Sequence, residues 1–428
     1  MIVFRRAHRS EPLKEIVIFF FSIIVARYCR IAAKGGIEFM KRHLIIAVSL
    51  FVVILLTAVL AQESINIGVV MNLTGHWASI DTPCANGVEL AASQINGAGG
   101  ILGREIRLEI VDTMADEEET RRVVVRLIED EKVSVLIGYC DTHWVNIAAT
   151  VAGEYGVPFV TPGATHPRIP ERVGAWLACF GDNAQASAIA EYVVRELGLK
   201  RGAVWINTAV DFSVAVTEYF MDALDHYGGE TVLVDYFELN MKDFSSMAVR
   251  LKEYQDRGEV DFVYVGAVPD NCGLIARQLR ESGVTIPTFG EDGFDTPLLV
   301  EIGGEAAEGV VFATHVSLED PDETIRKFLS DYESMFGIVP ENAFAALGYD
   351  ALGLVAKAIE LAGSNSPAKV PEGLAQISDF EGVSGIISYN DGSKIPDKSV
   401  SIIQVENGEF RTVKQMIPEY LPDPAIAE

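Results

Sequence analysis

Basic side chains are scarce in this sequence of 428 residues. The chain has 34 Lys and Arg against 61 Asp and Glu, and its formal net charge is −27. This acidity argues against nucleic acid and against an anionic membrane surface as partners. Cysteine is scarce too: there are five, with no CxxC pair and no Cys/His spacing of the zinc type. No structural metal site is therefore expected.

The sequence also lacks the motifs of several enzyme classes. It has no G-x-S-x-G elbow, no P-loop and no HExxH helix. Glycines do cluster at residues 97–103, but this run follows a predicted helix and precedes a predicted strand, the reverse of a dinucleotide-binding loop. We interpret it as a turn that ends the helix. Neither an enzyme activity nor a cofactor is predicted.

The longest apolar run lies at residues 44–61, directly behind the basic segment 40–43. A positive segment, an apolar stretch and small residues at its end are the parts of a secretory signal. The run is also long enough to remain in the membrane as an anchor. We expect residues 40–61 to be a signal peptide or anchor, and residues 1–39 to be a non-native upstream extension. The rest is then exported, to the periplasm or the cell surface.

Four cysteines follow this segment: Cys84, Cys140, Cys179 and Cys272. An exported compartment permits disulfides, but the sequence identifies no pair. Buried free thiols remain the alternative.

Strand-like and helix-like segments alternate along the rest of the chain. Strands are predicted at 65–71, 105–111, 133–137, 157–161, 202–206, 231–237 and 262–266. Helices are predicted at 85–95, 118–131, 144–155, 184–196, 213–227, 244–257 and 272–281. This order with short loops is typical of parallel, doubly wound α/β sheets. Two such sheets are predicted, with several chain crossings between them and a late hairpin around Asn407-Gly408.

Several short segments occur in the same order as the sequence patterns of one protein family. A strand at 65–70 leads to Leu73-Thr74-Gly75, and a helix leads to Asn-Gly-Ala-Gly-Gly-Ile-Leu-Gly-Arg at 96–104. Further matching segments are Pro162-Gly163-Ala164-Thr165, Lys242-Asp243-Phe244, Tyr349-Asp350-Ala351 and Val383-Ser384-Gly385. Over residues 63 to about 413, the chain resembles the substrate-binding proteins of branched-chain amino-acid ABC transporters, which are type I periplasmic binding proteins.

The resemblance implies a two-lobe α/β fold. Each lobe is an open, mostly parallel sheet with helices on both faces, and a multi-crossing hinge joins the two. The implied boundaries are 65–182 and 312–393 for lobe 1, 183–311 and 394–413 for lobe 2, and 414–428 for a C-terminal tail. The implied ligand is a small amino acid, branched-chain or related. The implied partners are the permease subunits of an ABC importer with their cytoplasmic ATPases.

The resemblance also assigns ligand contacts. Thr142 falls where the family has a ligand-binding Ser, and Ala164 and Thr165 match the loop that contacts the carboxylate and ammonium. Asp292 matches the acid that holds the ammonium, and an unpaired buried carboxylate is costly, so it predicts a positively charged group on the ligand. The remaining candidate contacts are Gly163, Trp77, Phe212 and His143. From the residues alone, a helix cap at Thr142 and a plain turn at Asp292 stay open.

The loops depart from the family pattern in places. Phe212 lies where a Tyr-Gly pair is frequent, Val268-Pro269 replaces an aromatic residue, and Asp81 stands where glycine is usual. These departures leave the side chain of the ligand open.

Three histidines, His76, His143 and His166, are predicted on neighbouring loops close to Asp141. Histidine and carboxylate groups suit zinc or nickel. The histidines lie on separate loops without a paired spacing, so we predict polar contacts to ligand or water there and no metal.

Two other functions remain open at this stage. One is a ligand-binding sensor ectodomain, which would require a signalling or membrane segment after the lobes. The other is an importer component for an amide or another solute that is not an amino acid.

Overall fold

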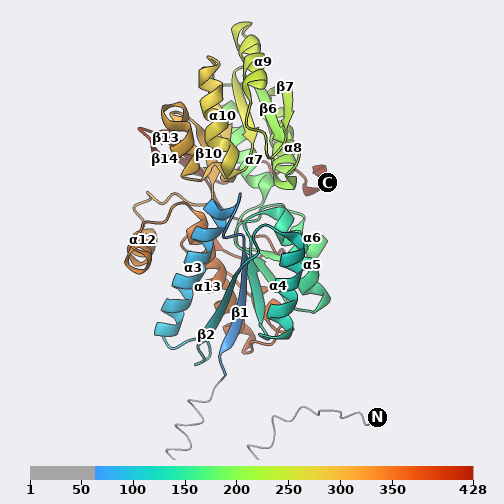
Figure 1. Cartoon of the computed structure of the whole chain (residues 1–428), viewed down its shortest axis with the longest axis vertical. Helices are drawn as coiled ribbons and strands as arrows, with labels where there is room; N and C mark the ends of the chain where they lie inside the picture. Colours follow the sequence, from blue (N-terminus) through green and yellow to red (C-terminus); the bar gives the residue numbers. More distant parts are fainter. Residues whose placement is uncertain (1–62, 428) are drawn as a thin grey trace, which may run out of the picture. The chain divides into compact units, whose positions relative to one another are not determined.

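A computed structural model describes residues 63–427, so the predicted leader at 40–61 and the extension at 1–39 lie outside the described residues. Within residues 63–427, no helix is both long and apolar enough to cross a membrane. These residues form two lobes, each built around its own sheet (Figure 1). We call the lobe with the five-stranded sheet the first lobe and the lobe with the seven-stranded sheet the second lobe.

The sheet of the first lobe is parallel throughout, in the order β2-β1-β3-β4-β5. Its strands are β1 (Ile65–Met71), β2 (Ile106–Asp112), β3 (Val135–Gly138), β4 (Phe159–Thr161) and β5 (Trp176–Leu177). Helices α3 (Ala78–Gly97) and α13 (Phe344–Ala362) pack together on one face, with α4 (Glu117–Glu129) and α5 (Thr142–Glu154) on the other (Figure 1). The smaller elements are α6 (Ile169–Val173), α12 (Glu323–Phe336), α14 (Val370–Leu374), β11 (Phe380–Gly382) and β12 (Gly385–Ile387).

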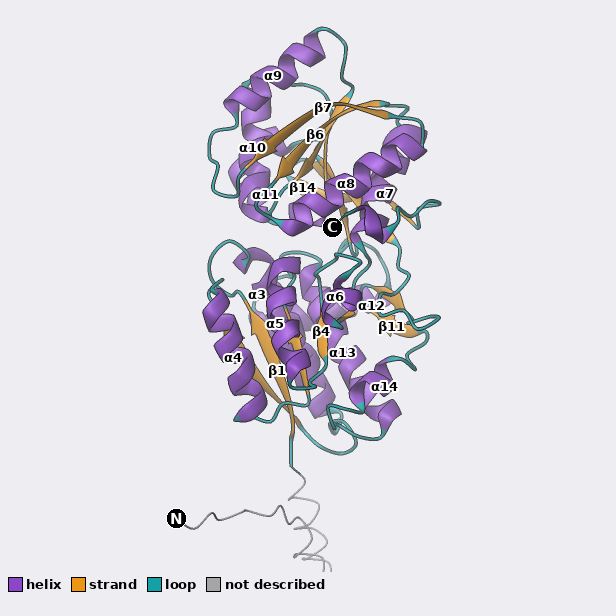
Figure 2. Cartoon of the chain, turned by 90° about the vertical axis from the view of Figure 1, so that its right-hand side faces the viewer, coloured by secondary structure: helices purple, strands orange, loops and turns teal. Residues whose placement is uncertain are grey.

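The sheet of the second lobe has the order β14-β13-β10-β9-β8-β6-β7. Its strands are β6 (Arg201–Asn207), β7 (Glu230–Phe237), β8 (Phe262–Gly266), β9 (Thr288–Gly290), β10 (Val311–Thr314), β13 (Val400–Glu406) and β14 (Glu409–Met416). The helical elements are α7 (Asp182–Glu191), a π-turn (Tyr192–Glu196), α8 (Asp211–His226), α9 (Ser245–Asp256), α10 (Pro269–Glu281) and α11 (Leu298–Gly303), with 3-10 turns at Asp292–Phe294, Gly304–Ala307 and Pro424–Ile426. Helices α7 and α8 contribute to one apolar core, and α9, α10 and α11 to another, so both faces are covered (Figure 2). The predicted doubly wound α/β architecture is confirmed.

The predicted hairpin is present as β13 and β14, which pair antiparallel. Asn407 and Gly408 at its tip have φ of 54° and 76°, as a tight turn between twisted strands requires. The predicted lobe boundary at residue 312 falls inside β10, which pairs with both β9 and β13. The chain therefore returns to the first lobe only after Thr314.

The chain passes between the lobes three times, after β5, after β10 and after β12. As a result, the apolar core of the first lobe combines residues 65–179 with residues 344–389. Neither lobe is one continuous stretch of sequence.

Helix α3 begins at Ala78, seven residues before the predicted start at Ala85. Pro83 obscures this start in the sequence because a proline inside a helix removes a backbone hydrogen bond. The carbonyl left free by Pro83 is that of Ser79, and it accepts a hydrogen bond of 2.8 Å from Nδ2 of Asn342. A residue far along the chain thus compensates for the proline.

The glycine run after α3 forms the predicted turn: α3 ends at Gly97, and Gly99, Gly100 and Gly103 have positive φ before β2 begins. The four cysteines in residues 63–427 are all free and buried.

Candidate functional site

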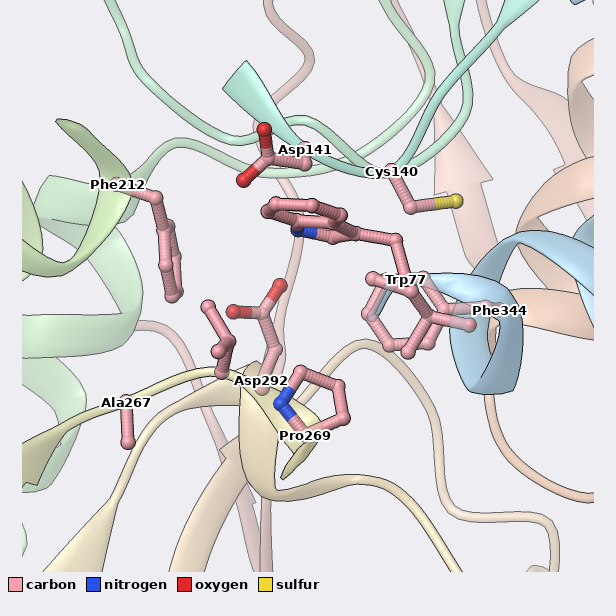
Figure 3. A pocket seen from close by; sticks show the side chains of 11 residues that line it. Trp77, Cys140, Asp141, Phe212, Ala267, Pro269, Asp292 and Phe344 are labelled. Carbon is pink, nitrogen blue, oxygen red and sulfur yellow. The ribbon is translucent and has the colours of Figure 1, made fainter. Parts of the chain in front are cut away.

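A small cavity lies between the two lobes, where the loops that follow the strands of both sheets meet (Figure 3). Its volume is about 20 Å³, which holds about one water molecule. The first lobe lines it with Trp77, Ile80, Cys140, Asp141 and Phe344, and the second with Phe212, Ala267, Val268, Pro269, Asp292 and Gly293. We call it the inner cavity.

The starts of helices and the ends of strands place the main side chains at this cavity. Trp77 directly precedes α3, and Asp141 directly precedes α5. Phe212 lies in the first turn of α8, and Asp292 follows β9. Phe344 begins α13, far along the chain from the others of the first lobe. The parallel strand order brings these distant segments to one edge of each sheet.

Asp81 links two loops on the first-lobe side of the cavity. Its Oδ2 accepts a hydrogen bond of 2.7 Å from the backbone N–H of Asn72, and its Oδ1 accepts one of 2.9 Å from that of Cys140. The carboxyl group thereby joins the loop after β1 to the loop after β3. Burial raises the pKa of Asp81 to about 7.

Asp292 brings a carboxylate from the second lobe into the cavity. Its Oδ1 accepts a hydrogen bond of 3.0 Å from Nε2 of Gln185, and its Oδ2 lies 2.9 Å from Nε2 of His315. Burial lowers the pKa of His315, so the imidazole is neutral, with the proton on Nε2 for this hydrogen bond. Two groups therefore orient Asp292 while it still lines the cavity.

Two further acids lie buried beside Asp292. Burial, with Asp292 as a neighbouring negative charge, raises the pKa of Asp182 and of Glu291 well above the ordinary range. Gln185 connects Asp182 to Asp292, since its Nε2 lies 3.0 Å from Oδ1 of Asp182 and 3.0 Å from Oδ1 of Asp292.

Asp141 brings a carboxylate from the first lobe. Its Oδ1 accepts a hydrogen bond of 3.0 Å from the backbone N–H of His143, so it caps the start of α5. Burial raises the pKa of Asp141 to about 6, and the negative charge of Asp211 adds to the rise. Figure 3 shows the indole of Trp77 between the carboxyl groups of Asp141 and Asp292.

A second, larger space of about 610 Å³ adjoins the inner cavity and shares Trp77 and Asp141 with it. We call it the outer groove. Its other lining residues are His76, Ala115, Asp116, Glu117, Glu118, His143, Trp144, Ala209, Val210, Asp211, Leu239 and Asn240. No Lys or Arg lines either space within residues 63–427.

The structure brings some of the predicted contacts together and separates others. Trp77, Phe212 and Asp292 line the inner cavity, and His143 lines the outer groove. The remaining four are buried and line neither space: Thr142, Gly163, Ala164 and Thr165.

These four residues lie just behind the inner cavity. Gly163 leaves room for the ring of Phe344, since a Cβ there would come within 2.9 Å of it. The backbone N–H of Ala164 donates to Oγ1 of Thr161 at 3.0 Å, and the side chain of Thr165 is hydrogen-bonded to Asp182. Oγ1 of Thr142 is buried and has no hydrogen-bond partner among the described residues.

The three histidines of the cleft loops have separate partners. Nδ1 of His76 lies 2.5 Å from Oδ2 of Asp270, a contact that links the two lobes, and Nε2 of His143 lies 3.2 Å from Oε1 of Glu117. His166 is buried, which lowers its pKa to about 4. Among residues 63–427, no three His, Cys, Asp or Glu side chains are placed to hold a metal ion.

Sequence reasoning missed Phe344 and Cys140 as lining residues and gave Asp141 no role of its own. Asp141 carried a usable signal, because an aspartate between a predicted strand and a predicted helix is a typical helix cap beyond a strand end. Phe344 carried none, since its helix joins the first lobe through long-range packing, mainly of α13 against α3.

The buried acids around the cavity make stability depend on pH. Asp81 has a folded pKa of about 7, and the pKa values of Asp182 and Glu291 are higher than usual, whereas unfolded Asp and Glu titrate near pH 4. Their stabilising contribution is therefore complete below about pH 4 and is lost progressively as the pH rises from there to the folded pKa. The buried histidines, with lowered pKa values, act in the opposite direction up to about pH 7.5 and offset part of this loss.

We therefore expect the free energy of unfolding to fall by about 1 kcal/mol or more as the pH rises from about 4.5 to 6.5, the range in which Asp81 and Asp141 lose their protons in the unfolded chain but largely keep them in the folded one. Urea unfolding at four pH values across this range measures it. A free energy that stays constant or rises over the range would contradict the expected protonation of these acids.

Comparison with known proteins agrees with the two-lobe fold. Residues 64–409 match the family model described as periplasmic binding protein. The chain is 29% identical over 358 residues to the Leu/Ile/Val-binding protein BraC3 of Rhizobium johnstonii, covering 82% of this chain and 95% of that one.

Solved structures of binding proteins are also similar to this chain. The leucine binding protein LivK of Thermotoga maritima is 31% identical, with a TM-score of 0.77, and the match covers 83% of this chain and 99% of that one. The branched-chain amino acid transporter substrate binding protein LivJ of Streptococcus pneumoniae, solved in complex with isoleucine, is 27% identical, with a TM-score of 0.76 and coverage of 83% and 99%.

Proposed function

Because this chain belongs to the periplasmic binding protein family, we propose that it is the solute-binding component of an ABC importer for a small amino acid. It captures the ligand between its lobes and delivers it to membrane permease subunits. As a member of this family it is an exported transport protein and not an enzyme. The segment 44–61 directs the export, as a cleaved signal or as an anchor.

The observation that carries this proposal is the cavity between the lobes with the carboxylate of Asp292 at its wall. An amino acid needs an anion for its ammonium group, and Asp292 supplies one that Gln185 and His315 hold in place. The relatives reported above are named for leucine, isoleucine and valine binding, which supports a ligand of the amino-acid class.

Donors for the carboxylate of the ligand come from the first lobe. The indole N–H of Trp77 is the proposed contact, because it has no partner within residues 63–427 and Trp77 lines the cavity, whereas Thr142 lines neither space. Thr165 and Ala164 support the same wall from behind. Trp77, Phe212 and Phe344 enclose the apolar part of the ligand.

The size of the inner cavity implies a mechanism. A space of about 20 Å³ does not admit an amino acid, so the lobes must separate for the ligand to enter. The lobes then close on the ligand around a wider cavity than the present one, so the ligand contacts both lobes at once and shifts the population toward closure. Closure is the signal that a permease can recognise.

A thermal-shift series against the twenty amino acids tests the proposal. The cognate amino acid at 100 times its Kd should stabilise the protein by about 2.7 kcal/mol and raise Tm by several degrees. Isothermal titration calorimetry then gives the affinity. If no amino acid shifts Tm, the amino-acid ligand is wrong, and an amide or another solute takes its place.

A further inference from the structure

Both charged groups at the inner cavity are acids, and they come from opposite lobes. Asp141 belongs to the first lobe and Asp292 to the second, and Figure 3 shows their carboxyl groups on either side of Trp77. In the described part of the chain, no Lys or Arg lines the cavity to balance them. A neutral amino acid has one ammonium group, so it could pair with only one of the two.

The outer groove is lined by acidic residues as well. Asp116, Glu117, Glu118 and Asp211 line it in addition to Asp141. Its two histidines are already paired with carboxylates, His76 with Asp270 and His143 with Glu117. A ligand that approaches through this groove therefore meets a negative field, which attracts cations and repels anions.

Asp141 also occupies a position that would otherwise suit an anion. The start of a helix offers free N–H groups and a partial positive charge, which favour a carboxylate from a ligand. Here the carboxylate of Asp141 itself accepts the hydrogen bond from His143 N–H at the start of α5. A carboxylate of the ligand at this spot would be repelled, and a cation would be attracted.

Helix capping alone does not require this charge. Asn or Ser would cap α5 equally well. Asp141 instead places a carboxylate, only 5% exposed, in a site without a Lys or Arg partner, and burying such a charge is costly. The raised pKa of Asp141 agrees with a charge that lacks a strong partner. The hydrogen bond from His143 uses Oδ1 of Asp141, which leaves Oδ2 for a ligand. Asp141 lines both the inner cavity and the outer groove.

The remaining walls suit an organic cation. Trp77, Phe212 and Phe344 present aromatic rings to the cavity, and such rings attract ammonium and guanidinium groups. Trp77 is 8% exposed, and its Nε1 has no hydrogen-bond partner within residues 63–427. In Figure 3 this nitrogen is on the edge of the indole turned toward Asp292, inside the pocket. It can donate to an oxygen of the ligand.

We infer that the ligand carries a net positive charge, with one cationic group at Asp292 and a second at Asp141 against the aromatic walls. The inference rests on the proposed function and narrows it: among amino acids, one with an ammonium or guanidinium side chain meets both carboxylates. Its carboxylate oxygen accepts from Nε1 of Trp77, away from the start of α5.

Calorimetry with three matched compounds tests this. Lysine and norleucine share the same carbon chain and differ in the side-chain ammonium, and cadaverine keeps both ammonium groups without the carboxylate. We expect lysine to bind at least about tenfold more tightly than norleucine, and the difference to shrink as salt is raised.

Each other outcome has a separate meaning. Equal binding of lysine and norleucine, or a preference for norleucine, overturns the inference and leaves the amino-acid proposal standing. Binding of cadaverine without either amino acid supports the cationic ligand and overturns the amino-acid proposal. Binding of none of the three overturns the inference, and the series of twenty amino acids then decides the amino-acid proposal.

The variant Asp141→Asn assigns the effect to one residue, because asparagine also caps a helix. Its affinity for lysine should fall about tenfold or more, while its affinity for norleucine stays the same or improves. The matched control is Asp322→Asn, which changes another capping aspartate, at α12, that lines neither space. Equal losses for lysine and norleucine in Asp141→Asn would reduce Asp141 to a structural cap and overturn its role as a cation contact.

Discussion

The variant Asp292→Asn is expected to bind the amino-acid ligand about 30-fold more weakly or worse, with its fold intact. Removing one partner of a buried charge pair costs roughly 2–5 kcal/mol. Asparagine has nearly the same shape as aspartate, and its oxygen can still accept from Gln185. His315 can also adapt, because its Nδ1 has no partner among the described residues and can take the proton from Nε2. The loss of charge is then the main change.

Calorimetry measures the affinity, and thermal unfolding checks the fold. The matched control is Asp235→Asn, which changes a largely buried acid of the same lobe that pairs with Arg250 and does not line the cavity. It should leave affinity unchanged. Unchanged affinity in Asp292→Asn itself would show that the ligand carries no ammonium group at this position.

The variant Gly87→Ala is expected to lower the free energy of unfolding by about 3 kcal/mol or more. Gly87 lies in α3 where this helix crosses α13, and an added Cβ would overlap the backbone carbonyl oxygen of Ala345. Gly348 faces α3 from the other helix, where a Cβ would overlap the carbonyl oxygen of Cys84. Since these neighbours are backbone atoms, the helices must move apart, and the core of the first lobe loosens.

The same helix offers the control. Gly97, the last residue of α3, has no heavy atom within 4 Å of an added Cβ. The variant Gly97→Ala should therefore change stability by no more than about 1 kcal/mol, in the stabilising direction. Urea unfolding of both variants measures the difference. Equal effects at the two positions would contradict a close crossing of α3 and α13.

The sequence predicts the features of this fold that depend on neighbouring residues. The alternation of strands and helices, the Asn407-Gly408 turn and the glycine turn after α3 each follow from local patterns. The start of α3 does not, since Pro83 is tolerated only because Asn342 binds the carbonyl of Ser79. That contact joins residues far apart in sequence, so no local pattern predicts it.

The same distinction applies to the candidate site. Trp77, Phe212 and Asp292 follow strand ends or begin helices, and the carboxyl-end rule finds such positions. Thr142 and Thr165 satisfy that rule as well, yet their side chains turn into the protein and line neither space. Sequence position brings a residue to the cleft, but the packing of its neighbours decides which way the side chain points.

The three crossings between the lobes also affect synthesis of the chain. Strands β1 to β5 leave the ribosome first, but α13, which covers one face of their sheet, begins about 170 residues after β5 ends. At 5–20 residues per second, this delay is about 10 to 30 s. During that interval the first lobe cannot complete its core. An exported protein gains from this order, because a nascent chain that folds late remains able to thread through a translocation channel.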